Sequence, residues 1–359
     1  MAEFRSGRPV IISSARSTAA LPVDGMTDQR LDAFRQFCAP ERPHLLITSR
    51  RALALGLDAP QAVRLDIGEQ ADAATIHALV GDAGVRRGLE VLDAGANADA
   101  AIDLAKLAQC LPALLVADVT ENAAAHTASL VQVNAEFIGR FRKAAADSLV
   151  IAAEADVPLS GALAARFVVF HDALGGNSTA VIVGKPDLTA PVPVRLHSAC
   201  LTGDVFGSRR CDCGDQLRLS LRRLDDQGGG IILYLDQEGR GLGLANKMRT
   251  YQLQDDGLDT LDANATLGFD DDERDYGIAA RILHLLGCTR VKLLTNNPAK
   301  LDGLTQAGVE VCGRIPLHGP VNADNFRYLS AKATRAGHKL EYLLAEPAGT
   351  VPVGGDPAS

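Results

Sequence analysis

The sequence predicts an α/β (α+β) protein of two domains. At 359 residues the chain is long enough for two hydrophobic cores, and its 47% hydrophobic content is typical of globular proteins. In both parts of the chain, short apolar runs bounded by turn residues alternate with helix-like runs, which favours sheets covered by helices. The prolines of residues 184–194 indicate an extended connection, and the character of the sequence changes after them.

The first part of the chain is rich in alanine and leucine and predicts strands and one clear helix. The apolar runs "HLLITS" (44–49), "ALLVADVT" (113–120) and "SLVIAAE" (148–154) are typical of strands. The run "NADAAIDLAKLAQ" (97–109) has the periodicity of a helix. No residue in this part resembles a site.

The second part predicts two buried strands, "GGGIILYL" (228–235) and "TRVKLLT" (289–295), because both are short apolar runs between turn residues. Two apolar stripes at helical spacing predict helices: Leu217, Leu221 and Leu224, then Ile278, Ile282 and Leu286. The ending "AEPAGTVPVGGDPAS" is rich in proline and glycine, so we expect a disordered tail.

Composition restricts the possible partners. The formal net charge of −8 disfavours bulk nucleic-acid binding, although it allows a local basic pocket for a phosphorylated small molecule. The apolar runs are too short to span a membrane, and the polar start lacks the apolar core of a signal peptide. Seven cysteines, three of them crowded together, fit a reducing compartment better than a disulfide framework. We therefore expect a cytoplasmic protein without nucleic-acid or membrane partners.

The three crowded cysteines, Cys200, Cys211 and Cys213, predict a zinc site. Three protein ligands would leave one position for water, which is the arrangement of a catalytic zinc. His197 could instead complete a closed structural site, and the thiols could also be buried without a metal.

Three further segments carry candidate site residues. In "DQEGRGLGLANK", Gly239 belongs to a glycine-rich turn after a strand, Glu238 is suited to the hydrogen-bond donors of guanine, and Arg240 is suited to phosphate, although an ordinary turn is the alternative. In "LGFDDDERDYG", Asp272 and Arg274 are candidates for a general base and an electrophile, whereas the alternative is an acidic first helical turn.

The third segment, "LLTNNPAKLDGL", contains Thr295 and Lys300 where a strand ends and a helix starts near Pro298. The amides of such a helix start could bind an anion. An ordinary turn from strand to helix explains the segment equally well.

These segments, in this order, resemble GTP cyclohydrolase II. The resemblance rests on "RLHSACLTGDVFGSRRCDCGDQL", "DQEGRGLGLANKMRTYQLQDDGLDT", "ANATLGFDDDERDYG", "LLTNNPAKLDGL" and "KATRAGHKL", and it covers about residues 150–343. It implies a C-terminal domain of the GTP cyclohydrolase II type, residues 146–343, with a mixed sheet and flanking helices. Residues 1–145 would form the first domain and residues 344–359 the tail.

The resemblance also implies the site. Cys200, Cys211 and Cys213 would hold one catalytic Zn²⁺ per domain. The residues implied to contact GTP are Arg195, Leu196, His197, Ser198, Ala199, Gln216, Glu238, Gly239, Arg240, Thr260, Thr295 and Lys300. Ala199 departs from the family, in which glutamate is usual.

The implied reaction opens the guanine imidazole ring of GTP and releases formate and diphosphate, as the first step of riboflavin biosynthesis. Asp272 corresponds to the proton acceptor, Arg274 to the residue that acts on the α-phosphate, and Tyr251 to the tyrosine associated with complete deformylation. A guanidinium has no free lone pair, so stabilising phosphoryl charge is the easier role for Arg274. Mg²⁺ is expected with the GTP phosphates, and a homodimer is expected by family analogy.

The first domain resembles a degenerate dihydroxybutanone phosphate synthase. After "GRPVIISS" that family has an acidic run, but this chain has "ARSTAALPVDG", and Asn97 stands where the family has a histidine. Alanines cannot bind a hard metal, so we expect this domain to be inactive as a lyase. Two alternatives remain for the whole protein: a diverged paralogue that makes a formylated or other product, and a non-catalytic GTP-binding regulator.

Overall fold

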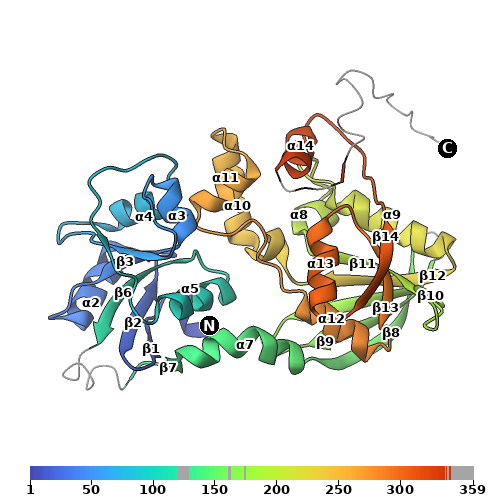
Figure 1. Cartoon of the computed structure of the whole chain (residues 1–359), viewed down its shortest axis with the longest axis horizontal. Helices are drawn as coiled ribbons and strands as arrows, with labels where there is room; N and C mark the ends of the chain where they lie inside the picture. The colour runs from blue at the N-terminus through green and yellow to red at the C-terminus, as the bar shows by residue number, and fades with distance from the viewer. Residues whose placement is uncertain (120–128, 161–162, 174, 336, 338, 341–359) are drawn as a thin grey trace.

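The computed structural model contains two seven-stranded sheets, and it describes residues 1–119, 129–160, 163–173, 175–335, 337 and 339–340 (Figure 1). The predicted α/β fold class is confirmed. The expected tail, residues 344–359, lies outside the described residues. Below, the chain up to strand β7 is the N-terminal half, and the chain from strand β8 onward is the C-terminal half.

The sheet of the N-terminal half has the strand order β5-β4-β3-β6-β2-β1-β7. Its strands are antiparallel except for the β1–β7 pair, which is parallel. The strands are β1 (Val10–Ser13), β2 (Ser17–Pro22), β3 (His44–Ile47), β4 (Val63–Leu65), β5 (Val91–Leu92), β6 (Ala113–Val119) and β7 (Gln132–Asn134). The helices are α1 (Ala2–Arg5), α2 (Asp28–Cys38), α3 (Ser49–Ala54), α4 (Ala73–Gly81) and α5 (Ala98–Leu107).

Helix α7 (Ala135–Asp147) connects the two halves (Figure 1). Asn134 caps its start by accepting a hydrogen bond from the backbone amide of Glu136. The domain boundary expected between residues 145 and 146 falls within this helix.

The sheet of the C-terminal half is mixed, with the order β14-β13-β11-β12-β10-β9-β8. The pairs β12–β11, β11–β13 and β13–β14 are parallel, and the pairs β12–β10, β10–β9 and β9–β8 are antiparallel. The strands are β8 (Val150–Leu159), β9 (Leu163–His171), β10 (Asn177–Gly184), β11 (Val192–Ser198), β12 (Gly229–Leu235), β13 (Arg290–Leu294) and β14 (Glu310–Ile315). The helices are α8 (Leu201–Asp204), α9 (Cys213–Asp226), η2 (Glu238–Gly241), α10 (Leu244–Asp255), α11 (Thr260–Thr266), α12 (Gly277–Leu285), α13 (Pro298–Gln306) and α14 (Phe326–Thr334).

The strands that the apolar runs predicted are present in the structure. Residues 44–49 contain β3 and residues 113–120 contain β6, and the two are paired in the first sheet. The run 148–154, grouped above with the first part of the chain, instead begins the edge strand β8 of the second sheet. Periodicity identifies a strand, but it does not identify the sheet that the strand joins.

The leucine stripe of α9 lies against the second sheet, as its spacing predicts, with Leu224 fully buried. Ile278 and Ile282 of α12 are also buried. The alternative for the acidic run is wrong, because residues 270–275 precede α12, which begins only at Gly277. These carboxylates therefore lie in a loop rather than in a first helical turn.

Helices α10 and α11 lie between the two sheets (Figure 1). Leu242, Leu253, Ala263, Leu267 and Phe269, from these helices and the segments beside them, belong to the same buried cluster as the core of the N-terminal half. Each is at most 8% exposed. The two halves therefore share one hydrophobic core at this junction.

Within the described ranges, no helix combines the length and the apolar character that a membrane crossing requires.

Candidate functional site

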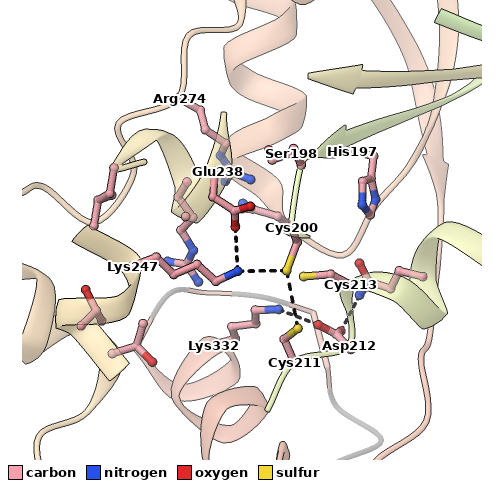
Figure 2. A pocket seen from close by; sticks show the side chains of 18 of the residues that line it. His197, Ser198, Cys200, Cys211, Asp212, Cys213, Glu238, Lys247, Arg274 and Lys332 are labelled. Atoms are coloured by element: carbon pink, nitrogen blue, oxygen red, sulfur yellow. Dashed lines mark hydrogen bonds and ion pairs between the residues drawn. The ribbon is translucent and has the colours of Figure 1, made fainter. Parts of the chain in front are cut away.

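The three clustered cysteines converge at the carboxyl end of β11. Cys200 follows this strand, Cys211 lies in the loop after α8, and Cys213 is the first residue of α9. Their sulfur atoms all lie within 4.8 Å of one another, and the Cys200 and Cys211 sulfurs are 3.7 Å apart (Figure 2). Tetrahedral coordination with Zn–S bonds of about 2.3 Å places sulfurs about 3.8 Å apart, so the donor set fits zinc.

Gly203 makes this convergence possible. A Cβ atom at this position would lie 2.8 Å from the Cys211 sulfur and 3.1 Å from the Cys200 sulfur. Since carbon and sulfur atoms cannot approach so closely, a side chain here would force the cysteines apart.

Lys247 of α10 supplies a positive charge beside the thiols. Its Nζ lies 3.1 Å from the Cys200 sulfur and 2.6 Å from a carboxylate oxygen of Glu238 (Figure 2). Hydrogen bonds from Cys211 and Cys213, together with the Lys247 charge, lower the pKa of the Cys200 thiol. Conversely, the interaction with Cys200 raises the pKa of Cys211 to about 11. The cluster therefore favours the thiolate at Cys200, which is the form that binds a metal.

His197 does not complete a closed metal site. Among the described residues, the group able to hold a metal consists of the three cysteines alone. The His197 Nε2 atom instead lies 3.0 and 3.1 Å from the two carboxylate oxygens of Asp204. Asp204 also accepts hydrogen bonds from the Cys200 amide and the Tyr234 hydroxyl. Asp204 thus connects the histidine to the backbone of Cys200.

The cysteines border a pocket that opens to solvent. Of the residues expected from the sequence, these line it: Arg195, His197, Ser198, Ala199, Cys200, Cys211, Cys213, Gln216, Glu238, Gly239, Arg240, Tyr251, Thr260, Arg274, Thr295 and Lys300.

Two expected residues do not line the pocket. The Leu196 side chain is buried in the core of the C-terminal half, and its carbonyl accepts a hydrogen bond of 2.6 Å from Lys300. Asp272 lies behind Arg274, whose Nε is 2.7 Å from an Asp272 carboxylate oxygen. Burial raises the pKa of Asp272, but the opposing effect of the Arg274 guanidinium is larger, so the pKa is lowered overall. Asp272 is therefore a weak base in this arrangement.

Two buried basic side chains line the pocket, Arg195 from β11 and Lys300 from the first turn of α13. Burial lowers the pKa of Arg195 to about 10 and lowers the pKa of Lys300 well below its usual value. Arg195 also disfavours the charged form of Lys300. Close to these cations, Asn297 caps the start of α13. An anion such as phosphate would relieve this repulsion.

Glu238 and Arg240 lie in the glycine-rich turn that follows β12. Both Glu238 carboxylate oxygens are engaged, one by Lys247 at 2.6 Å and the other by the Leu201 amide at 2.7 Å. Arg240 has φ 63° and ψ 33°, a left-handed conformation that is uncommon for residues other than glycine. This strained residue and its neighbours Glu238 and Gly239 all line the pocket.

Ala199 is in place but makes only a backbone interaction. Its amide donates a hydrogen bond of 2.8 Å to the Leu235 carbonyl. The amide is therefore already used within the protein, and the carbonyl is the backbone group of Ala199 that could accept a hydrogen bond from a ligand.

The sequence interpretation missed several residues of the pocket. Lys247, Thr250, Tyr251 and Gln254 all line it from α10, and only Tyr251 was expected. Their spacing of three, four and seven residues is a polar stripe along one helix face, and this signal was available in the sequence. Asp212, Asn264, Asn296, Asn297, Lys332 and Leu340 also line the pocket.

Comparison with known proteins shows the family. The family model for GTP cyclohydrolase II matches residues 151–316. A GTP cyclohydrolase-2 of Xylella fastidiosa (strain 9a5c) is 40% identical over 356 residues, which cover 95% of this chain and 86% of that protein. The chain belongs to the GTP cyclohydrolase II family.

Three further similarities were found. A GTP cyclohydrolase-2 of Azospirillum brasilense is 42% identical, with 94% of this chain and 92% of that protein covered. A riboflavin biosynthesis protein RibBA of Parabacteroides distasonis is 40% identical over 70% of this chain and 65% of its own length. A crystal structure of a two-domain 3,4-dihydroxy-2-butanone 4-phosphate synthase from A. baumannii aligns over 86% of this chain and 97% of that chain, with a TM-score of 0.33 and 16% identity.

Proposed function

We propose that the protein hydrolyses GTP as a zinc-dependent GTP cyclohydrolase II in riboflavin biosynthesis. The products would be 2,5-diamino-6-ribosylamino-4-pyrimidinone 5'-phosphate, formate and diphosphate. The observation that carries the proposal is the convergence of three thiols at one side of a pocket that also contains two buried cations. The family membership agrees with this combination of groups.

The chemistry of each side chain in the pocket suggests its role in the proposed reaction. Zinc bound by the three thiolates would supply Lewis-acid activation of water for attack on the guanine ring. Glu238 would orient the guanine edge after exchanging its present partners, since a carboxylate accepts two hydrogen bonds from the ring N–H and amine. His197, held by Asp204, would keep its position beside the metal ligands.

The phosphate end is served by Arg195, Lys300 and Arg274. All three are basic side chains that line the pocket, and the Arg274 side chain is 8% exposed. Arg274 would stabilise charge on the α-phosphate during diphosphate release. Once Arg274 turns to the phosphate, Asp272 loses its strongest partner, so its pKa would rise and the carboxylate would become a better proton acceptor. Mg²⁺ would accompany the triphosphate.

We also propose that the N-terminal half has no lyase activity. Asn97 is 1% exposed, and its side-chain amide donates to the carbonyls of Ile12 and Arg16 and to the Thr18 hydroxyl. The residue therefore serves the packing of β1 and β2. Absence of turnover of ribulose 5-phosphate by the purified protein is the expected result.

Formate release from GTP tests the proposed activity. Zinc-loaded protein with GTP and Mg²⁺ should release formate, and mass spectrometry should show the fully deformylated product. Cys211→Ser should reduce formate release by more than about 100-fold, because it removes a metal ligand. The matched control is Cys312→Ser, since Cys312 is an exposed cysteine outside the cluster. Folded, zinc-loaded protein that releases no formate would contradict the proposal, and a formylated product would favour the diverged paralogue.

A further inference from the structure

A lysine of the N-terminal half contacts the loop that carries Asp272 and Arg274. Lys106, at the end of α5, places its Nζ 2.6 Å from a Glu273 carboxylate oxygen and 3.2 Å from an Asp270 carboxylate oxygen. The Lys106 side chain is 12% exposed and that of Glu273 is 10% exposed. The Lys106–Glu273 pair is therefore largely shielded from solvent, unlike a typical surface ion pair, whereas the Asp270 side chain is 52% exposed.

Two other residues of the N-terminal half hold the start of the same loop. The Arg50 Nε lies 3.0 Å from an Asp270 carboxylate oxygen, and the Thr48 hydroxyl donates a hydrogen bond of 2.7 Å to the Gly268 carbonyl. Burial raises the pKa of Asp270, but Lys106 and Arg50 together lower it, so the carboxylate remains charged.

The loop is in turn joined to the glycine-rich turn of the pocket. The Glu273 carboxylate accepts a hydrogen bond from the Asp270 amide, and the Glu273 amide donates one of 3.1 Å to the Arg240 carbonyl. Gly241 packs so closely on Glu273 that a Cβ atom would lie 2.7 Å from its carbonyl oxygen. A shift of Glu273 would therefore move Arg240 and Gly241 of the glycine-rich turn.

The position of Lys106 has a direct consequence for the pocket. Asp272 lies between Asp270 and Glu273 in the chain, and Arg274 follows. Without a cation, two carboxylates close to one lysine would repel each other, and one of them is nearly buried. The loop would then keep Arg50 and Thr48 before Asp272 but lose its ion pair at Glu273, after Asp272.

We propose that Lys106 is a positioning residue for Asp272 and Arg274, so that the N-terminal half forms part of the GTP cyclohydrolase site. This inference rests on the proposed function. It assigns the N-terminal half a task that does not depend on lyase chemistry, namely to hold the loop of the neighbouring site.

Three variants of the full-length, zinc-loaded protein test the inference. Lys106→Met removes the charge and keeps most of the side-chain length. Lys106→Arg keeps the charge. Arg249→Met is the matched control, because Arg249 forms another ion pair between the halves, 2.9 Å from Asp24, and it does not line the pocket.

The kinetic readout is the separate change in kcat and KM for GTP. Lys106→Met should lower kcat by about 10- to 100-fold with a smaller change in KM, since misplaced reacting groups mainly slow the chemical step. Lys106→Arg should restore most of kcat, and Arg249→Met should change it by less than about threefold. An unchanged kcat in Lys106→Met, or an equal loss in Arg249→Met, would overturn the inference.

Hydrogen exchange provides a readout that does not depend on turnover. The amides of Asp270, Glu273 and Arg274 are hydrogen-bonded, so a peptide spanning residues 268–276 should exchange at least several-fold faster in Lys106→Met alone. If wild-type protein does not turn over GTP, the proposed function fails, and this exchange measurement decides whether Lys106 orders the loop. Equal exchange in Lys106→Met and wild type would exclude that role.

Discussion

Lys300 is a buried cation in a pocket that otherwise repels it. Its Nζ donates to the Leu196 carbonyl, and the nearby guanidinium groups of Arg195 and Arg274 disfavour its charged form. Burial and these neighbours lower the pKa of Lys300, and an anion beside it would raise that pKa again. Binding of an anion would then be coupled to uptake of a proton.

We predict that GTP binding to metal-free protein takes up a proton at Lys300. The pKa of Lys300 is lowered in the free protein, and the phosphates would raise it, so uptake should grow as pH rises through the lowered value. Calorimetry in buffers of different ionisation enthalpy measures this number of protons. Lys300→Met should abolish the uptake and weaken GTP binding by about tenfold or more. The exposed Lys292→Met should behave as wild type. Identical proton numbers in wild type and Lys300→Met would contradict the prediction.

Among the individual site residues, those that belong to local sequence motifs could be predicted. The three cysteines are close in sequence, so their spacing alone indicated a metal site. Asp204 and Lys106 were not identified, because an isolated aspartate or lysine gains its meaning only from partners brought to it by the fold: Lys106 contacts residues more than 160 positions away. Zinc itself remains a prediction.

Helix α14 contacts Asp212, which lies between two of the clustered cysteines, and the sequence did not predict this contact. Its Lys332 lies 3.0 Å from a carboxylate oxygen of Asp212, the residue between Cys211 and Cys213 (Figure 2). The two side chains are 10% and 4% exposed. This helix lies beyond residues 151–316, the region matched by the family model.

We predict that Lys332→Met destabilises the protein by about 3 kcal/mol, because it leaves the buried Asp212 carboxylate without this partner. The expected result is a clear fall in Tm and faster release of zinc to a chelator. Arg209→Met serves as the control, since it breaks an exposed ion pair with Asp324 and should cost less than about 1 kcal/mol. Equal Tm values for the two variants would show that the buried Lys332–Asp212 ion pair stabilises the protein no more than the exposed Arg209–Asp324 pair.

The elements themselves could largely be predicted. Short apolar runs bounded by turn residues identified β3, β6, β12 and β13, and helical periodicity identified α5 and α9. Strand partners could not be predicted, since the same apolar pattern fits any sheet with a buried face. The acidic run was also ambiguous, and only the structure separates a loop from a first helical turn.

The whole molecule has a shared core at the junction of its halves. Phe269 is 1% exposed and Leu253 is 8% exposed, and both pack among residues of the N-terminal sheet. The opposite face of α10 lines the pocket through Lys247 and Tyr251. Folding of the N-terminal half therefore supports one wall of the site.

We predict that the two halves unfold in one cooperative transition. Phe269→Ala should destabilise the whole protein by about 3–5 kcal/mol, because it leaves a cavity in the core that both halves use. Scanning calorimetry should record one peak that moves to lower temperature in the variant. Two separate peaks, of which only one moves, would contradict this expectation.

The junction also constrains how the gene can change over time. The surface that supports α10 and α11 is constrained by packing, whether or not the N-terminal half has a reaction of its own. Substitutions should therefore be rarer around Phe269 and its neighbours than on the exposed surface of the N-terminal half. A change that moved this buried surface would also move the helix that lines the pocket.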